Sequence, residues 1–195
     1  MESTKKSSLI VPVRPGWDEF FLDLAGKYSR RGTCFRRQYG AFIVDREKRP
    51  VSAGYCGAPS GVDNCLEVGY CYRHENDIPA GMAYEKCVSC HAEVNAVLFA
   101  DDRSRLKDST LYLAGWDVQK GAATASPPCI NCLKVIIQMK IGKVVLLPDE
   151  ITIRELSQGM KIGKVIPLSD ERMIREISLD EMIDKLSKRN FDYPY

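Results

Sequence analysis

The chain has 195 residues, of which 45% are hydrophobic and 28% are charged, and a formal net charge of +2. This charge is too small to indicate nucleic acid or a membrane surface as a partner. Residues 1–16 contain no apolar run of the length that a secretion signal needs, and no stretch approaches the ~20 apolar residues of a membrane span. We therefore expect a cytoplasmic protein with one domain over residues 1–195, its core over about 17–170 and a helical tail over 171–195.

The first half of the chain predicts a helix, a hairpin and a long loop. Apolar side chains recur at helical spacing from Trp17 to about Arg30. The expected apolar face contains Phe20, Phe21, Leu24 and Tyr28. Two short strands follow, Gly40–Asp45 and Pro50–Tyr55, and the polar turn between them predicts a hairpin. Residues 56–87 are rich in Gly, Pro and Cys and show no sustained period, which predicts a long loop held by something other than a core, such as a metal.

The second half alternates helices with strands. We predict, in chain order, a helix near residues 90–100, a strand at 110–113, an irregular stretch at 115–126, a helix opened by two prolines at 127–128, strands at 143–147 and 164–168, and a surface helix at 179–188. The two later strands lie in near-repeats, MKIGKVVLLPDE and MKIGKVIPLSDE, and the segment between them is long enough for the crossover helix that parallel strands require. Strands separated by helices predict an α/β fold with helices on both faces of a sheet.

The helix over CHAEVNAVLFA (90–100) carries polar groups where burial is expected. Seven of its last nine residues are apolar and are not confined to one stripe, so this helix would be buried on nearly every side. Burial of His91, Glu93 and Asn95 is costly unless each side chain has a partner. These three residues are therefore candidates for a functional site.

A metal would supply such a partner. Cys129 and Cys132 are three residues apart at a helix start, so their thiols point the same way, and helix N-termini favour thiolates. Together with His91 they make three ligands for Zn²⁺ and leave the fourth tetrahedral position to water, as in catalytic zinc sites. Glu93, two residues from His91, can take a proton from that water without binding the metal. This arrangement resembles the H-x-E…P-C-x-x-C signature of zinc-dependent nucleobase deaminases.

The chain contains eight cysteines and no recognisable export signal, which favours metal-binding or catalytic thiols over disulfides. A rival hypothesis pairs Cys87 and Cys90 with Cys129 and Cys132 in a zinc-ribbon-like binding module. The two pairs are separated by 38 residues, whereas about 15–20 is usual in such modules. The rival also leaves the histidine and the glutamate between the pairs without a purpose.

Seven segments, in order over roughly residues 17–147, resemble the deoxycytidylate (dCMP) deaminase family. They are RGTCFRR, YGAFIVD, GYCGAPSG, NCLEVGYC, IPAG, CVSCHAEVNA and PPCINC. The resemblance implies a cytidine-deaminase-like three-layer sandwich, in which a five-stranded mixed sheet carries helices on both faces. It also implies a homo-oligomer that hydrolyses dCMP to dUMP and ammonia with zinc, regulated in many members by dCTP and dTTP with Mg²⁺.

The resemblance also implies roles for single residues. Glu93 would move a proton from the activated water to N3 of cytosine and then to the leaving ammonia. The Ala92 backbone would hydrogen-bond the base. Asn95 would either act in catalysis or form a hydrogen bond with a buried backbone group. Apart from the resemblance, a charge run before the first predicted strand offers Arg30, Arg31, Arg36 and Arg37 as contacts for the substrate phosphate. A charge run is more often a solvated face, so only Arg31 is assigned to the phosphate.

Four further cysteines match cysteine positions of family members that carry a second, structural zinc. They are Cys34, Cys65, Cys71 and Cys87. Such a zinc would pin the long loop, and the alternative is four unrelated buried thiols. Cys90 is left over and is expected to contribute only to packing.

Two departures from the family bear on the substrate. Many relatives have Asn, whose amide reaches the sugar 3′-hydroxyl, at the position of Cys56, and a thiol is a poor hydrogen-bonding group. Relatives also pass from the third strand to PCxxC in a few residues, whereas this chain inserts GWDVQKGAATAS (115–126). Deoxycytidine, dCTP and a polynucleotide therefore stay open as substrates, although the insertion offers only Trp116 as an aromatic platform for a polynucleotide.

Overall fold

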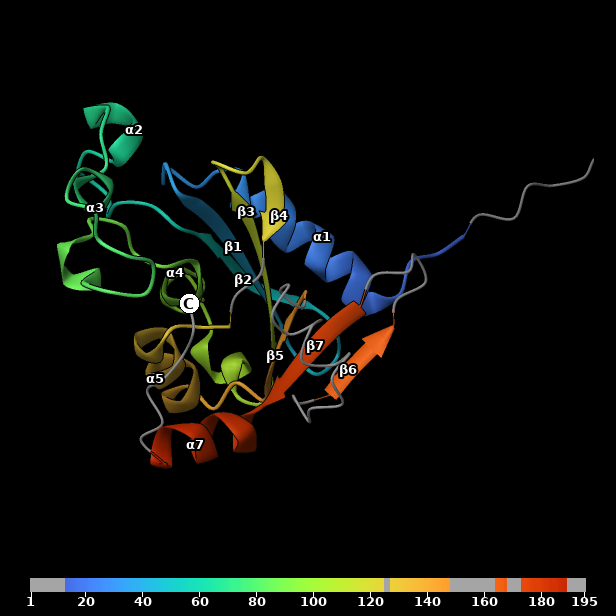
Figure 1. Ribbon diagram of the computed structural model, residues 1–195. Helices are drawn as coiled ribbons and strands as arrows, with labels where there is room; N and C mark the ends of the chain where they lie inside the picture. The colour runs from blue at the N-terminus through green and yellow to red at the C-terminus, as the bar shows by residue number, and fades with distance from the viewer. Residues whose placement is uncertain (1–12, 125–126, 148–163, 168–172, 189–195) are drawn as a thin grey trace, which may run out of the picture.

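The computed structural model describes residues 13–124, 127–147, 164–167 and 173–188 (Figure 1). Within them, a central sheet carries helices on both sides, which confirms the predicted α/β class. In this part of the chain, no helix combines the length and the apolar character needed to cross a membrane.

Seven strands form the mixed sheet. They are β1 (Arg37–Val44), β2 (Pro50–Tyr55), β3 (Thr110–Asp117), β4 (Ala122–Thr124), β5 (Lys143–Leu146), β6 (Lys164–Pro167) and β7 (Met173–Ser178). Their order is β2-β1-β3-β5-β7-β6, and β4 pairs with the end of β3. The predicted hairpin is confirmed as β1 and β2. Among the described strands, only β3 and β5 are parallel neighbours, and the other pairs are antiparallel.

The predicted count of five strands is too low, because β4 and β7 also join the sheet. Strand β4 lies in the segment 115–126 that was expected to be irregular, where β3 extends beyond its pairing with β5 and turns back on itself. Strand β7 lies in the segment 171–195 that was expected to be a helical tail, and it is inserted between β5 and β6. The near-repeats are therefore on strands that are not neighbours. The crossover helix expected between them falls outside the described residues.

Charged side chains make strand β7 difficult to recognise in the sequence. In MIREIS, Ile174 and Ile177 are buried, and they belong to the cores on opposite faces of the sheet. The two charges between them are paired: Glu176 accepts from Lys143 Nζ at 2.6 Å, and Arg175 pairs with a carboxylate of the following helix. Because the ion pairs interrupt the apolar pattern, neither a strand nor a helix period stands out. Helix α7 (Leu179–Ser187) follows directly, where a surface helix is predicted.

Helices α1, α4, α5 and α7 form the outer layers (Figure 1). Helix α1 (Trp17–Ser29) covers one face of the sheet, while α4 (Ala92–Leu98) and α5 (Ile130–Gln138) lie on the other, with α7 beside α5. The alternation of side chains along β1 separates the two cores. Ala41 and Ile43 belong to the core under α4 and α5, whereas Phe42 and Val44 belong to the core under α1.

The buried face of α1 is shifted from the predicted one. Phe21 and Leu22 are buried, whereas Phe20 and Tyr28 are 43% and 40% exposed. A hydrogen bond also joins the first turn of α1 to the sheet. The hydroxyl of the fully buried Tyr112 donates to a carboxylate in the first turn of α1 at 2.6 Å, which holds that turn over β3.

The predicted loop over residues 56–87 contains three very short helices. They are α2 (Cys65–Val68), α3 (Tyr72–Glu75) and the 3₁₀ helix η1 (Tyr84–Lys86), and a second 3₁₀ helix, η2 (Arg103–Leu106), precedes β3. Helix α2 starts at a capping box formed by Asn64 and Glu67 and ends at Gly69, whose φ is 79°. Elements of four residues or fewer are too short to show a period, so the sequence indicates only a loop.

Helix α4 approaches β2 so closely that only glycine fits at position 54. A β-carbon there would lie closer than 3.0 Å to backbone atoms of Ala92, Asn95 and Ala96. We expect Gly54→Ala to lower the free energy of unfolding by roughly 1–3 kcal/mol, because backbone atoms cannot move aside singly. Urea denaturation measures the change. The control is Gly26→Ala in α1, where the nearest atom is 4.0 Å away and a gain of up to about 1 kcal/mol is expected. Equal stability of Gly54→Ala and the parent protein would contradict the close packing.

Candidate active site

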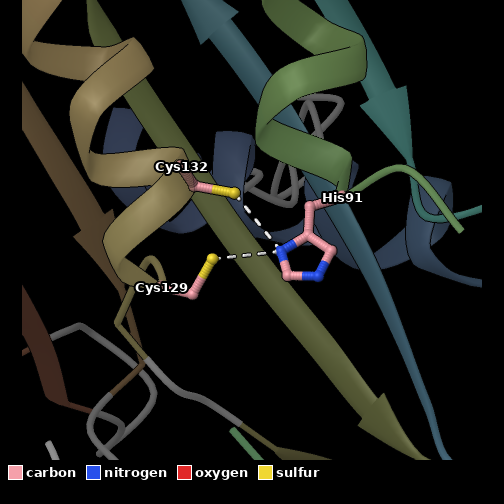
Figure 2. Close-up of side chains that lie close together, drawn as sticks. All are labelled: His91, Cys129 and Cys132. Atoms are coloured by element: carbon pink, nitrogen blue, oxygen red, sulfur yellow. Dashed lines mark hydrogen bonds between the residues drawn. The ribbon is translucent and has the colours of Figure 1, made fainter. Parts of the chain in front are cut away.

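Three predicted metal ligands meet between the starts of two helices. His91 is the N-cap residue of α4, Cys129 is the N-cap residue of α5, and Cys132 lies in the first turn of α5. Figure 2 shows the imidazole facing both thiols, with Nδ1 3.3 Å from each sulfur atom. Among the described residues, this is the only group of three or more His, Cys, Asp or Glu side chains whose ligand atoms all lie within 4.8 Å of one another.

Backbone contacts hold the start of α4 against β2. Cys90 exchanges two hydrogen bonds with Gly57, at 2.8 and 3.2 Å, and so ties the residue before His91 to the loop that follows β2. One turn later, the Asn95 amide donates to the carbonyl oxygen of Tyr55 at 2.8 Å. Of the two roles open for Asn95, this contact is the structural one: it satisfies the backbone at the end of β2.

The donor set and its spacing fit zinc. Zinc binds thiolate sulfur at about 2.3 Å and imidazole nitrogen at about 2.0–2.1 Å, so a tetrahedral ion places these atoms roughly 3.5 Å apart. The observed separations of 3.3 Å agree with this value. One imidazole and two thiolates leave a fourth position free, which is the composition of a catalytic rather than a structural zinc site.

The thiols and the imidazole share protons among themselves. The pKa of Cys129 is lowered to about 4, because the Cys132 thiol donates a hydrogen bond to its sulfur and His91 adds a second contact. The pKa of Cys132 is correspondingly raised, since it is the donor in that bond. Burial opposes a charge on His91, but its contact with Cys129 and the nearby Glu93 carboxylate outweigh burial and raise its pKa. A bound metal ion would therefore replace the protons that His91 and Cys132 hold.

Glu93 lies beside this cluster without belonging to it. Its side chain is buried, at 5% exposure, and burial raises its pKa even though the charge of His91 acts in the opposite direction. The carboxyl group also contacts the Cys132 thiol. A carboxyl group with a raised pKa, held next to a metal site, is suited to accepting a proton and giving it up again.

A cavity of about 340 Å³ opens onto these residues. His91, Ala92, Glu93 and Cys129 line one part of it. Tyr39 and Cys56 come from the first hairpin, and further residues come from the long loop and the end of β3. This volume lies in the range of small-molecule sites.

A family model described as the cytidine and deoxycytidylate deaminase zinc-binding region matches residues 15–147 of this chain. The chain belongs to this deaminase family. It is 34% identical over 137 residues to the deoxycytidylate deaminase of Mycobacterium phage D29, covering 68% of this chain and 94% of that one. It is 32% identical over 146 residues to the deoxycytidylate deaminase of Schizosaccharomyces pombe, covering 74% of this chain but only 41% of that relative. A solved dCMP deaminase from cyanophage S-TIM5 aligns with 25% identity and a TM-score of 0.48, covering 76% and 97% of the two chains.

The predicted substrate contacts take different places relative to the cavity in this deaminase family member. Ala92 and Cys56 both line the cavity, whereas Arg31 does not; Arg36 and Arg37 line it instead. Arg31 lies in the turn that ends α1, where its amide bonds to Tyr28. Of the arginines before the long loop, those that line the cavity are Arg37, the first residue of β1, and Arg36, which precedes it.

The Cys56 thiol is occupied by the backbone of β1. Its sulfur accepts from the amide of Tyr39 at 3.2 Å, and the thiol donates to the carbonyl oxygen of Arg37 at 3.6 Å. Burial raises the pKa of Cys56 to about 12, so the group stays a neutral thiol. It therefore offers no directional hydrogen bond into the cavity.

The four cysteines assigned to a second metal lie near one another in the deaminase. Burial raises the pKa of Cys65 to about 11, and the neighbouring Cys71, Cys34 and Cys87 raise it further. In the described part of the chain, however, their sulfur atoms do not gather to the 4.8 Å that unites His91 with its two cysteines. Three of these thiols, all except Cys65, line the same cavity.

Arg73 and Tyr84 are site residues that sequence reasoning missed. Arg73 is buried, its guanidinium lies 5.0 Å from the centre of the Tyr84 ring, and that ring meets His91 edge-on at 4.8 Å. The guanidinium donates to the carbonyl oxygens of Pro79 and Met82, at 2.8 and 2.6 Å. The long loop is thereby packed against His91. The only sequence signal was an arginine two residues after Cys71, and burial of that arginine is visible only in the fold.

Proposed function

We propose that this chain hydrolyses dCMP to dUMP and ammonia in a zinc-dependent reaction. The observation that carries the proposal is the buried Glu93 carboxyl beside the His91, Cys129 and Cys132 ligand atoms, at a cavity of nucleotide size that Glu93, His91 and Cys129 line. The family match and the relatives named deoxycytidylate deaminase support the choice of reaction. A binding module has no use for a buried carboxyl next to its metal.

Each of these residues has a role in that reaction. His91, Cys129 and Cys132 hold zinc, which supplies a water whose pKa is lowered toward about 7. Glu93 takes one proton from the water and delivers it to N3 of the cytosine ring while the water oxygen bonds to C4. It then takes the second proton from that oxygen and gives it to the amino group, so that the C4–N bond breaks, ammonia leaves and a carbonyl group remains at C4. The Ala92 backbone hydrogen-bonds the base and holds C4 toward the metal ligands. Burial of Glu93 keeps bulk water from competing for the proton.

Ammonia release from a panel of dCMP, deoxycytidine, dCTP and a single-stranded oligonucleotide tests the proposal. We expect dCMP to be deaminated well and deoxycytidine poorly, because a charge-assisted contact to the phosphate supplies much of the binding. Equal kcat/KM values for deoxycytidine and dCMP would contradict the nucleotide assignment. Preference for the oligonucleotide would move the activity to another substrate class.

The same assay tests the effect of Cys56. Since its thiol is bound to the β1 backbone, the sugar 3′-hydroxyl has no directional partner at this position. A neutral hydrogen bond contributes roughly 0.5–1.5 kcal/mol, so Cys56→Asn should leave kcat/KM for dCMP unchanged or raise it by up to about tenfold. The control substrate is 3′-deoxygenated dCMP, which should not gain. Loss of activity in Cys56→Asn would show that the cysteine has a role of its own.

The remaining expectations belong to the same proposal. We propose a second, structural zinc on Cys34, Cys65, Cys71 and Cys87, because all four match cysteine positions of the family and the other three thiols lie close enough to Cys65 to act on it. A homo-oligomer, dCTP and dTTP as effectors with Mg²⁺, and a cytoplasmic location are proposed from the family resemblance.

A further inference from the structure

The turn between β3 and β4 brings a lysine to the cavity. We infer that this hairpin recognises the phosphate of the substrate and that the Lys120 ammonium group binds it. The inference rests on the proposed deamination of a cytosine nucleotide and names the residue that selects nucleotide over nucleoside. Asp117, Gln119 and Lys120, all from the hairpin, line the same cavity as His91 and Glu93.

The hairpin turn has a defined shape. Oδ1 of Asp117 accepts hydrogen bonds from the amides of Gln119 (3.1 Å) and Lys120 (3.0 Å), as in an Asx turn. The next residue, Gly121, has a φ of 62°, a left-handed conformation that glycine adopts without strain. The backbone that carries Lys120 is thus set by the turn itself.

The turn is also attached to the segment that precedes and opens β1. The backbone amide of Val118 donates to the carbonyl oxygen of Arg36 at 3.0 Å. The side-chain amide of Gln119 donates to the carbonyl oxygen of Phe35, also at 3.0 Å. Arg37 lies opposite Asp117 in the strand register, and the two side chains are 3.7 Å apart. Because Arg36 and Arg37 line the cavity too, the position of Lys120 is fixed relative to the cavity wall.

Among the cations that line the cavity, Lys120 is the one without a protein partner in the described residues. Arg36 donates to the carbonyl oxygen of Ile78 at 2.8 Å, Arg37 pairs with Asp117, and Arg73 donates to two carbonyl oxygens of its own loop. No hydrogen bond or ion pair engages the Lys120 ammonium group within the part of the chain that the structure covers, and its side chain is exposed. A phosphate can therefore bind the Lys120 ammonium group without displacing a protein contact.

The charges that line the cavity determine the orientation in which the nucleotide binds. The carboxylates that line it are Glu93, next to the metal ligands, and Asp117, which Arg37 neutralises. The reaction requires the amino-bearing carbon of the base to lie at Glu93 and the metal ligands. The phosphate at the other end of the nucleotide then lies near Lys120, whose charge no further carboxylate of the cavity lining offsets. Arg36 and Arg37 add to the positive potential there.

Kinetics of hairpin variants on two substrates test the inference. We expect Lys120→Ala to lower kcat/KM for dCMP roughly ten- to a hundredfold, mainly through KM, because a hydrogen bond to a charged group is lost. The value for deoxycytidine should stay the same, since this substrate has no phosphate. Lys120→Glu should lose more on dCMP, and Lys120→Arg should retain most of the activity. The matched control is Lys107→Ala, which removes an exposed lysine that does not line the cavity.

Two patterns would overturn the inference. An unchanged kcat/KM for dCMP in Lys120→Ala would make Lys120 an ordinary solvated lysine. An equal loss on dCMP and deoxycytidine would make the hairpin a structural element without phosphate recognition.

Equilibrium binding of dUMP and deoxyuridine to the same variants separates this inference from the proposed function. If the parent protein releases no ammonia from dCMP but binds dUMP in a Lys120-dependent way, the proposed reaction fails and the inference stands. If dCMP is deaminated while Lys120→Ala binds dUMP as tightly as the parent protein, the inference fails and the reaction stands.

Discussion

Glu93→Gln is expected to keep the fold and the zinc while kcat falls by roughly 10²–10⁴-fold, the usual contribution of a general acid–base group. Glutamine has nearly the same shape as glutamate, so the buried site at 5% exposure is not opened or overfilled. The amide, however, can neither accept the first proton nor return it to the leaving amine. Burial raises the pKa of the Glu93 carboxyl, whereas the glutamine of the variant does not titrate.

Ammonia release under saturating dCMP measures this loss, with zinc content and the thermal unfolding midpoint recorded on the same preparation. The control is Glu85→Gln, the same chemical change at an exposed glutamate in η1. Activity of Glu93→Gln within a few-fold of the parent protein would mean that another residue moves the proton. If the parent protein and Glu93→Gln both contain zinc but neither releases ammonia, the zinc-ribbon-like module is supported instead.

Cys132→Ser is expected to lose both the catalytic zinc and all measurable turnover. Cys132 is 1% exposed and its sulfur lies 3.3 Å from His91 Nδ1, so the variant keeps the packing but replaces one of the three ligands by a hydroxyl, a weak ligand for zinc. The loss of turnover should exceed that of Glu93→Gln, because the activated water disappears together with its metal.

Elemental analysis of protein purified without chelator gives the number of zinc ions per chain. The control is Cys90→Ser, next to His91 in sequence but outside the ligand group, which should keep its zinc and its activity. Parent protein without zinc, or full zinc content in Cys132→Ser, would contradict the assigned ligands. A parent value near two supports the second site on the cysteines of the long loop, and a value near one leaves only the catalytic site.

The sequence alone determined those features that depend on residues close together in the chain. The helix starts at His91 and Cys129 follow from local apolar patterns and prolines, and the first hairpin follows from two short strands around a polar turn. The chemistry of the site could be named because zinc requires particular residue types at particular spacings, and Glu93 lies two residues from a ligand. The structure brings the three ligands together as that reasoning requires.

Only the tertiary structure decided the features that depend on distant partners. Strand β7 is stabilised by pairing between β5 and β6, and its two buried isoleucines face opposite sides of the sheet, so its own six residues show no period that identifies it. Arg31 and Arg36 cannot be told apart in sequence, because which of them reaches the cavity depends on where α1 ends and β1 begins. The insertion has no recognisable pattern, and its described part, residues 115–124, forms a hairpin because the end of β3 pairs with β1 on one side and with β4 on the other. Local sequence sets helix starts and metal chemistry, whereas the order of the strands and the shape of the cavity arise from long-range packing that no short segment encodes.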